Sequence, residues 1–223
     1  MLDEIPGDAV LYLINAIYFK DNWQIQFDKS KTRDVSFYNK DRSTANVRMM
    51  LLQDSTLRRY SDENFKAIEL PYSKSNTNMI IIQPYSNSSP NDYMSLLTLD
   101  KLNHILANLK AKSTLLSLPK FNLKTKYLLN DILSKLGIKK AFKNAEFSNI
   151  SDIGIFISRV LHDAAIEVDE AGTRASAATI VEFREMAVND EDFNVSQPFI
   201  FFITDKTTNA ILFAGKVNDL TVK

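Results

Sequence analysis

The sequence predicts an α+β fold, in which mixed β-sheets carry a small number of helices. Three observations predict it: a charge-free apolar run near the start, two later stretches with apolar residues every three to four positions, and a strand-turn-strand pattern at the end. With 223 residues and 45% apolar content, the chain can build a sizeable core. The composition is that of a globular protein.

Charge and cysteine content exclude several classes of function. Because 27 basic residues balance 27 acidic ones, no overall field attracts nucleic acid or anionic lipid, and we expect neither as a partner. The absence of Cys excludes disulfides, thiol catalysis and thiolate metal sites. We expect no membrane span, since no apolar run is long enough, and the sequence shows no signal-peptide pattern. We also expect no cofactor.

The apolar run covers residues 9–19 and is interrupted only by Asn15. Such a run predicts a strand that is buried on both faces in the middle of a sheet. A central strand needs neighbours on both sides. We therefore expect that elements which precede this strand in a complete domain are absent from this chain.

The middle and end of the chain are predicted as follows. Short strands are expected at 35–38, 47–60, 66–72 and 79–83, between polar turns. A helix is expected at 90–112, with Leu96, Leu99, Leu102, Ile105, Leu106 and Leu109 on one face. A strand at 115–123, a second amphipathic helix at 127–142 and a strand at 153–169 follow; in the last, Phe156, Val160, Ala164, Ile166 and Val168 share a face with His162. A hairpin at 198–217 turns at 205–209.

Between the last strand and the hairpin, residues 173–184 alternate with a period of two. One set is small or apolar and the other is mostly polar: Thr173, Ala175, Ala177, Thr179, Val181 and Phe183 against Arg174, Ser176, Ala178, Ile180, Glu182 and Arg184. This is the period of a half-buried strand, in a segment too polar for a permanent core strand. It predicts a loop able to become a strand. From the pattern alone, an Ala-rich helix at 175–184 is an equal alternative.

Several motifs carry a resemblance to one family. The string EVDEAGTRASAAT is similar to the hinge of the serpins, the serine protease inhibitors, whose usual form is close to E-x-N-E-E-G-T-E-A-A-A-A-T. LINAIYFKDNW resembles the serpin motif L-V-N-A-I-Y-F-K-G-x-W, with Asp21 where Gly is usual, and LPKF and PFIFFITDKTTNAILFAGKV resemble two further serpin strands. The chain is identified as a member of this family. Residues 1–223 resemble a partial serpin domain that lacks the amino-terminal helices and first main-sheet strands.

The resemblance implies a function without catalysis by the chain itself. A serpin offers its reactive-centre loop, here about residues 170–196, to a serine protease as a suicide substrate, and the cleaved loop inserts into the main sheet. The implied hinge residues are Glu170, Gly172, Thr173, Ala175, Ala177, Ala178 and Thr179. Family spacing from Gly172 places the reactive bond between Met186 and Ala187, with Glu185 and Arg184 as alternatives. Met186 favours a chymotrypsin- or elastase-like protease, and Arg184 a trypsin-like one.

Three more residues fall at the region where the resembled sheet opens: Asn15, Trp23 and His162. Asn15 and His162 each interrupt an apolar strand, and we expect them to lie near each other. The alternative interpretation is two satisfied core polar groups, and for Trp23 plain core packing. His104, on a helix, is expected at the solvated surface.

An enzyme is not expected, because two distant His, no Cys and only five Gly leave little with which to build a known catalytic site. The alternative function is a truncated serpin that does not inhibit: it is only cleaved, or it self-associates through an exposed sheet edge. The acceptor pattern for glycosylation occurs at Asn87, Asn149 and Asn194. With the family resemblance, it favours an extracellular parent protein that is a glycoprotein.

Overall fold

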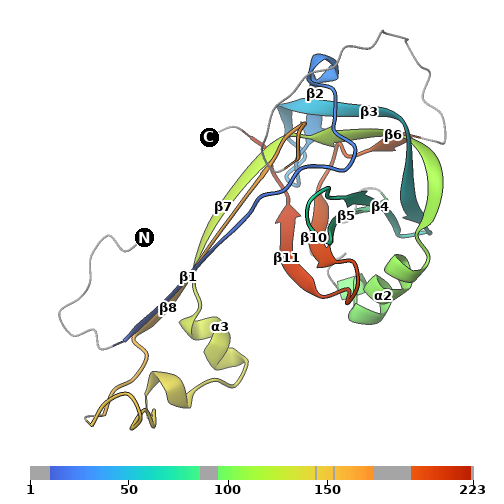
Figure 1. Cartoon of the computed structure of the whole chain (residues 1–223). Helices are drawn as coiled ribbons and strands as arrows, with labels where there is room; N and C mark the ends of the chain where they lie inside the picture. The colour runs from blue at the N-terminus through green and yellow to red at the C-terminus, as the bar shows by residue number, and fades with distance from the viewer. Residues whose placement is uncertain (1–10, 86–94, 144, 153, 173–191, 222–223) are drawn as a thin grey trace. The chain divides into compact units, whose positions relative to one another are not determined.

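The structure, a computed structural model, describes residues 11–85, 95–143, 145–152, 154–172 and 192–221. The chain divides into two compact units, which comprise residues 1–19 with 122–166 and residues 20–121 with 167–223 (Figure 1). The residues between Gly172 and β9 (Asp192–Asn194) therefore connect two points of the second unit.

The first unit is built on a three-stranded sheet with the order β1-β8-β7. Its strands are β1 (Tyr12–Phe19), β8 (Arg159–Val168) and β7 (Phe121–Leu128). β1 and β8 run parallel, in a register that starts with Tyr12 opposite Arg159 and ends with Phe19 opposite Ile166. The short helix α3 (Asn130–Lys135) and the 3-10 helix η2 (Lys140–Phe142) lie between β7 and β8 in the sequence.

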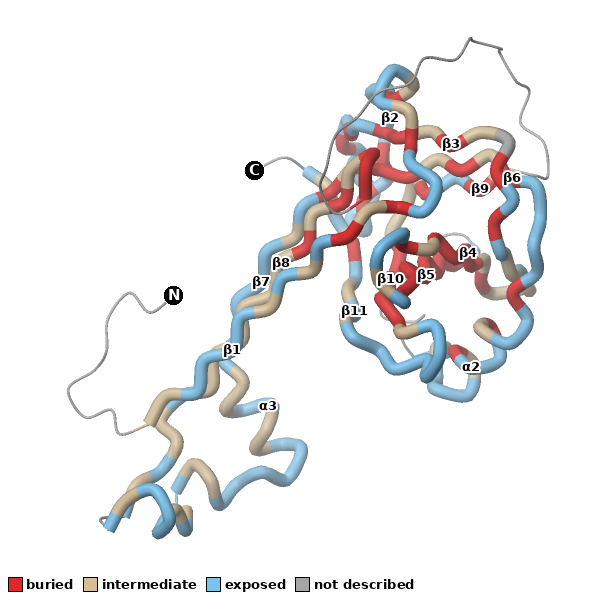
Figure 2. Tube along the Cα trace, viewed as in Figure 1, coloured by how far each residue is buried: buried red, intermediate tan, exposed pale blue. Residues whose placement is uncertain are grey.

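The expectation that residues 9–19 form a buried central strand is wrong for this chain. Residues 9 and 10 lie outside the described residues, and the rest form β1, at one end of its sheet. Leu13, Ile14 and Tyr18 are about half exposed (Figure 2). An apolar run favours burial only where other strands and layers surround it. Among the described residues, β1 pairs with β8 alone.

The second unit is built on an eight-stranded sheet with the order β11-β10-β5-β4-β3-β6-β9, in which β2 also pairs with β3. Its other strands are β2 (Arg33–Tyr38), β3 (Thr44–Ser61), β4 (Phe65–Pro71), β5 (Thr77–Pro84), β6 (Lys110–Pro119), β10 (Phe199–Asp205) and β11 (Ile211–Val217). Neighbouring strands are antiparallel except β6 and β9, which are parallel.

The core of the second unit centres on β4 and β5, shown in red in Figure 2. Every residue of β5 is buried, as expected for a strand in the middle of a sheet. Helix α2 (Leu99–Ala107) packs its apolar face against these strands. The contact is made by Phe65, Ala67, Ile80, Ile82, Leu102, Ile105 and Leu109.

The four short strands predicted in the first half are confirmed as β2 to β5; β2, β3 and β5 are longer than predicted, and β4 begins and ends one residue earlier. The hairpin is confirmed as β10 and β11. Its turn is held by Asp205, whose Oδ1 accepts hydrogen bonds from the backbone N–H groups of Thr207 and Thr208. Asn209 follows with a φ of 57°, which Asn tolerates better than most residues.

Both helix predictions were too long. α2 ends at Ala107, where Asn108 Nδ2 donates to the carbonyl of His104, and residues 110–112 belong to β6; residues 90–94 lie outside the described part. In the second stretch only Asn130–Lys135 is α-helical. Gly137, with a φ of 101°, adopts the left-handed conformation that ends helices.

Two strand predictions also need correction. The strand expected at 115–123 is two strands, β6 and β7, separated by Lys120. The strand expected at 153–169 starts only at Arg159 in β8, so Phe156 is not part of it, and residue 153 lies outside the described residues. In the first case continuous apolar content hid the break between two strands, and in the second it extended the predicted strand beyond the residues that pair.

Candidate functional site

The hinge turn, residues 169–172, directly follows β8. Asp169 N–H donates to the Gly172 carbonyl at 3.0 Å, Gly172 N–H donates to the Asp169 carbonyl at 3.3 Å, and Ala171 N–H donates to Asp169 Oδ1 at 2.9 Å. The φ of Gly172 is 131°, in the region that favours glycine. A Cβ atom there would lie 2.4 Å from Asn22 Cα and 2.5 Å from the Asp21 carbonyl oxygen, so no larger residue fits.

Glu170 anchors this turn through its carboxylate, and the residue is only 4% exposed. Its Oε2 accepts a hydrogen bond from Lys120 Nζ at 2.8 Å, and its Oε1 accepts one from Thr32 Oγ1 at 2.8 Å. Burial raises the pKa of Glu170, but the hydrogen bonds from Lys120 and Thr32 outweigh this effect, and the pKa lies below its ordinary value. The carboxylate is therefore charged at neutral pH.

Trp23 packs beside the hinge turn and is 2% exposed. Its backbone N–H donates to the Ala171 carbonyl, and its indole Nε1–H donates to the Asp169 carbonyl, both at 3.0 Å. The indole stacks on Tyr72, with ring centroids 4.6 Å apart. Trp23 is thus packed in the core, as one interpretation of the sequence had it, and it is also hydrogen-bonded to the hinge turn; its role in sheet opening stays a prediction.

Asn15 and His162 lie together in the first unit, as predicted. They are direct partners in the parallel pairing of β1 and β8, and Asn15 Nδ2 lies 3.0 Å from His162 Nδ1. Donation by the amide requires Nδ1 of the imidazole to be unprotonated. The alternative of two buried core groups is wrong for this chain, because Asn15 is exposed.

Most of the predicted reactive-centre loop lies outside the described residues, since 173–191 is not described. This applies to Thr173, Ala175, Ala177, Ala178 and Thr179, and to Arg184, Glu185, Met186 and Ala187. Their roles stay predictions. The structure describes the two ends of the segment, which are the hinge turn and β9.

Sequence reasoning missed two partners of the hinge, Lys120 and Thr32, and the carboxylate of Asp21, which binds the turn between β4 and β5. Glu170 is separated from Lys120 by 50 positions and from Thr32 by 138 positions. Lys120 is the charged residue of LPKF, and a charged residue next to an apolar strand does not by itself indicate an ion pair. Asp21 was noted only as a departure from the glycine that is usual at its position.

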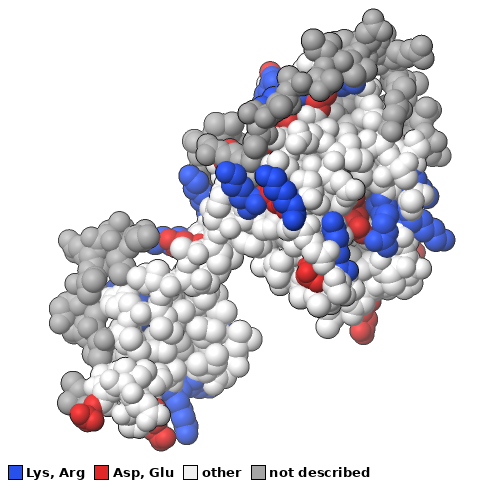
Figure 3. Space-filling view, viewed as in Figure 1, with Lys and Arg blue, Asp and Glu red and all other residues white. Residues whose placement is uncertain are grey.

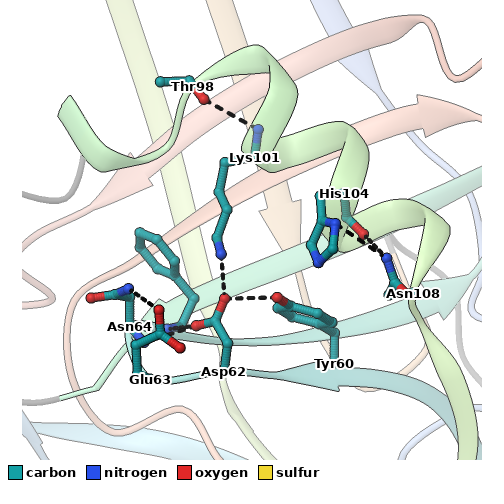
Figure 4. Close-up of polar contacts among 9 residues, drawn as sticks. Tyr60, Asp62, Glu63, Asn64, Thr98, Lys101, His104 and Asn108 are labelled. Carbon is teal, nitrogen blue, oxygen red and sulfur yellow. Dashed lines mark hydrogen bonds and ion pairs between the residues drawn. The ribbon is translucent and has the colours of Figure 1, made fainter.

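A second polar group, shown in Figure 4, joins α2 to the turn between β3 and β4. Asp62 Oδ2 accepts hydrogen bonds from Lys101 Nζ at 2.5 Å and Tyr60 OH at 2.7 Å. Its Oδ1 accepts from the N–H groups of Asn64 and Phe65. His104 is exposed, as predicted, with its ring edge-on to Tyr60. These contacts hold the helix in place and present no catalytic arrangement.

Figure 3 shows basic and acidic side chains together on the face drawn. Among the described residues there is no group of three or more His, Cys, Asp or Glu side chains that could hold a metal ion. No helix in the described part of the chain has the length and apolar character to cross a membrane. Asn149 and Asn194 are exposed, and Asn87 lies outside the described residues.

Comparison with known proteins gives one consistent result. The family model of the serpins (serine protease inhibitors) matches residues 1–220. Iripin-2 of Ixodes ricinus is 37% identical over 222 residues, which are 98% of this chain and 56% of that protein. The chain therefore spans little more than half the length of this relative.

Solved structures agree with the sequence comparison. The native state of the thermophilic serpin Tengpin superimposes with a TM-score of 0.87 at 34% identity, over 98% of this chain and 58% of that one. Human thyroxine-binding globulin, in complex with thyroxine, gives a TM-score of 0.87 at 27% identity, over 99% of this chain and 59% of that one. The chain belongs to the serpin family.

Proposed function

We propose that this chain carries the protease-trapping part of a serine protease inhibitor that acts as a suicide substrate. The protease attacks the loop at 173–191 and forms an acyl-enzyme, and the cleaved loop then inserts as a strand into the sheet of β1 and β8. The chain supplies no catalytic group. The bound protease is displaced and distorted, and deacylation stalls because an active site tolerates little misplacement of its groups.

The pairing of β8 is the observation that carries this proposal. β8 leads through the hinge turn into the loop, and its two edges are occupied by β7 and β1. A loop that folds back and inserts between β8 and β1 runs antiparallel to β8. It also runs antiparallel to β1, because β1 and β8 are parallel to each other. Insertion thus replaces one parallel pairing with two antiparallel ones. Antiparallel pairs are slightly more stable per residue, and an added strand completes more backbone hydrogen bonds.

The side chains of the loop support insertion. In the inserted strand, Thr173, Ala175, Ala177 and Thr179 face the protein, whereas Arg174 and Ala178 face solvent. Small neutral residues can be buried at little cost, while an unpaired charge cannot. Most serpins have Glu in place of Arg174, and the outward position of this residue makes the change harmless to insertion.

Counting from Gly172 places the reactive bond between Met186 and Ala187. Glu185 and Arg184 remain as alternatives, since the count back from Pro198 is ambiguous. With Met186 before the bond, the target is a protease with an apolar specificity pocket, of the chymotrypsin or elastase type. With Arg184 it is a trypsin-like protease.

A second function is favoured by the exposure of β1. Leu13 is 45%, Ile14 50% and Tyr18 53% exposed, and the described residues pair β1 with one neighbour only. An apolar edge strand pairs readily with another chain. In this alternative the chain is cleaved without trapping the protease, or self-associates through β1. The alternative is supported by the general rule that a fold does not by itself imply one function, and the name of the neighbour thyroxine-binding globulin states a binding function.

For location, we propose an extracellular glycoprotein as the parent protein. The support consists of the exposed acceptor residues Asn149 and Asn194.

The test is to incubate the 223-residue chain with chymotrypsin, elastase and trypsin and to search for a covalent adduct on a denaturing gel. We expect an adduct with chymotrypsin or elastase and a cleavage after Met186, mapped by mass spectrometry of the released peptide. Cleavage without an adduct supports the second function. Sedimentation of the uncleaved chain measures self-association.

A matched pair of variants distinguishes insertion from simple cleavage. Thr173→Arg adds a charge to the inward set, and Ser176→Arg adds the same charge to the outward set. We expect the first to be cleaved without adduct and the second to trap like the original chain. Equal behaviour of the two variants contradicts insertion.

A further inference from the structure

Asp21 lies between β1 and Trp23 in the sequence, and the residue is 5% exposed. Its Oδ2 accepts a hydrogen bond from Ser75 N–H at 2.7 Å, and its Oδ1 accepts from Lys74 N–H at 3.3 Å and Asn22 N–H at 2.7 Å. Lys74 and Ser75 belong to the turn between β4 and β5, more than 50 positions along the chain. One buried carboxylate therefore joins two separate loops.

The residues next to Asp21 touch this turn on one side and the hinge turn on the other. On the first side, the Asn22 carbonyl accepts from Ser73 N–H at 2.8 Å, and Trp23 stacks on Tyr72. On the second side, Asn22 forms a β-bridge with Gly172, and Trp23 N–H donates to the Ala171 carbonyl. The segment 21–23 thus lies between the β4–β5 turn and the hinge.

The contact with the hinge is tight. A Cβ atom on Gly172 would lie within 2.5 Å of three backbone atoms, and these belong to Asp21, Asn22 and Trp23. The backbone of the segment therefore contacts the backbone of the hinge glycine directly, and a shift of the segment toward the hinge changes the position of Gly172. The carboxylate of Asp21 is the group that fixes the other side of the segment.

The charge of Asp21 is balanced by N–H groups of the backbone and by the hydroxyl of Ser75. Burial raises the pKa of Asp21, but these hydrogen bonds outweigh it and keep the pKa below the ordinary value. Charge-assisted hydrogen bonds are about twice as strong as neutral ones, and a buried charge that loses them is costly. The β4–β5 turn is thereby held to the segment.

We propose that Asp21 is a positioning residue of the hinge. Its carboxylate holds the segment 21–23 against Gly172 and so sets the place from which the reactive-centre loop leaves β8. The consequence for protease trapping rests on the proposed inhibitory function. A loosely held hinge inserts more slowly, so that a larger share of the acyl-enzyme is hydrolysed before it is trapped.

The first test measures amide hydrogen exchange in the full chain, with the variants Asp21→Asn and Asp21→Gly. The control is Asp41→Asn, since Asp41 accepts equivalent bonds from Ser43 in an exposed turn between β2 and β3. We expect exchange about 10-fold faster or more at Lys74 and Ser75, and also at Trp23 and Gly172, and no change in the control. Faster exchange at Lys74 and Ser75 alone overturns the proposal. Where Asp21→Gly does not fold, the isosteric Asp21→Asn decides.

The second test measures how much of the loop-cleaved chain is trapped as an adduct. We expect a several-fold lower ratio of adduct to cleaved chain for Asp21→Asn than for Asp41→Asn. An unchanged ratio overturns the effect on trapping. If the original chain forms no adduct, the proposed inhibitory function fails, but the exchange at Gly172 still decides whether Asp21 positions the hinge.

Discussion

Lys120 Nζ lies 2.8 Å from Glu170 Oε2 and connects the point where β6 gives way to β7 with the hinge turn after β8. Glu170 is buried, whereas the side chain of Lys120 is 36% exposed. The loss of either partner leaves the charge of the other unpaired, and this is more costly for the buried carboxylate.

We expect Glu170→Gln to lower the free energy of unfolding by about 2 kcal/mol, less than for a fully buried pair because Lys120 reaches solvent. Lys120→Met should cost more than Glu170→Gln, because it leaves a buried charge unpaired. Urea denaturation measures both. The double variant should be more stable than the sum of the single effects predicts. Glu63→Gln, at an exposed position, is the control, and strict additivity would contradict a direct interaction.

The same pair predicts a pH dependence. The pKa of Glu170 in the folded chain lies below the ordinary value of 4.5. As the pH falls below that value, the unfolded chain therefore takes up this proton before the folded chain does. The stability from the pair is complete above pH 4.5 and is lost in more acid solution. Denaturation curves at pH 7, 5 and 4 should show a smaller loss for Glu170→Gln than for the original chain. Parallel losses would contradict this assignment.

Gly172 should tolerate no side chain. Gly172→Ala puts a Cβ atom 2.4 Å from Asn22 Cα and requires alanine at a φ of 131°. The neighbours are backbone atoms and cannot rotate away. We expect a loss of about 2 kcal/mol or more, measured by thermal denaturation. Gly154→Ala is the matched control, because no atom lies within 4 Å of its added Cβ. A stability of Gly172→Ala equal to that of the control would show that the hinge turn is not packed as described.

Part of the structure could be predicted from the sequence, either from local patterns or from the family resemblance. The contact of Asn15 with His162 followed from two polar residues in apolar strands together with the family resemblance. The hairpin of β10 and β11 followed from alternation and from the Asp205 turn. The hairpin depends on residues a few positions apart, whereas the contact of Asn15 with His162 joins residues 147 positions apart and was predicted with the help of the resemblance.

The rest depends on distant contacts and on the surroundings of each element. Nothing in LPKF indicates that Lys120 pairs with Glu170, since the pair exists only after the strands are placed. Likewise, the apolar run correctly predicted that β1 is a strand but wrongly predicted that this strand is buried. Burial depends on the layers around a strand, which a pattern within the strand does not describe.

Trp23 gives a spectroscopic report on the hinge, because it is the only tryptophan of the chain. Trp23→Phe keeps an aromatic ring against Tyr72 but removes the hydrogen bond from Nε1 to the Asp169 carbonyl. We expect a loss of about 1–2 kcal/mol in the free energy of unfolding. In the original chain, cleavage of the loop should shift the tryptophan emission if the hinge turn moves. Identical emission before and after complete cleavage would mean that the hinge turn does not move when the loop is cleaved.

Lys66 is expected to destabilise the folded chain at neutral pH. Its Nζ lies 4.7 Å from the centre of the Phe193 ring and donates to the Asn194 carbonyl at 2.9 Å. Burial, together with the positive charge of Arg59, lowers its pKa from 10.5 to about 8. The folded chain therefore releases this proton at lower pH than the unfolded chain does, and stability should rise with pH between about 8 and 10.5.

The change that tests this expectation is Lys66→Met, which keeps a long apolar side chain over Phe193 and removes the charge. Solvent screening and the contacts of the ammonium group reduce the effect, so we expect a gain of about 1 kcal/mol at pH 7 and none at pH 10.5. Lys112→Met, at an exposed position on β6, should show no such dependence on pH. The comparison is made by urea denaturation at both pH values. A loss of stability in Lys66→Met at pH 7 would mean that the bond to Asn194 and the contact with Phe193 outweigh the cost of burying the charge.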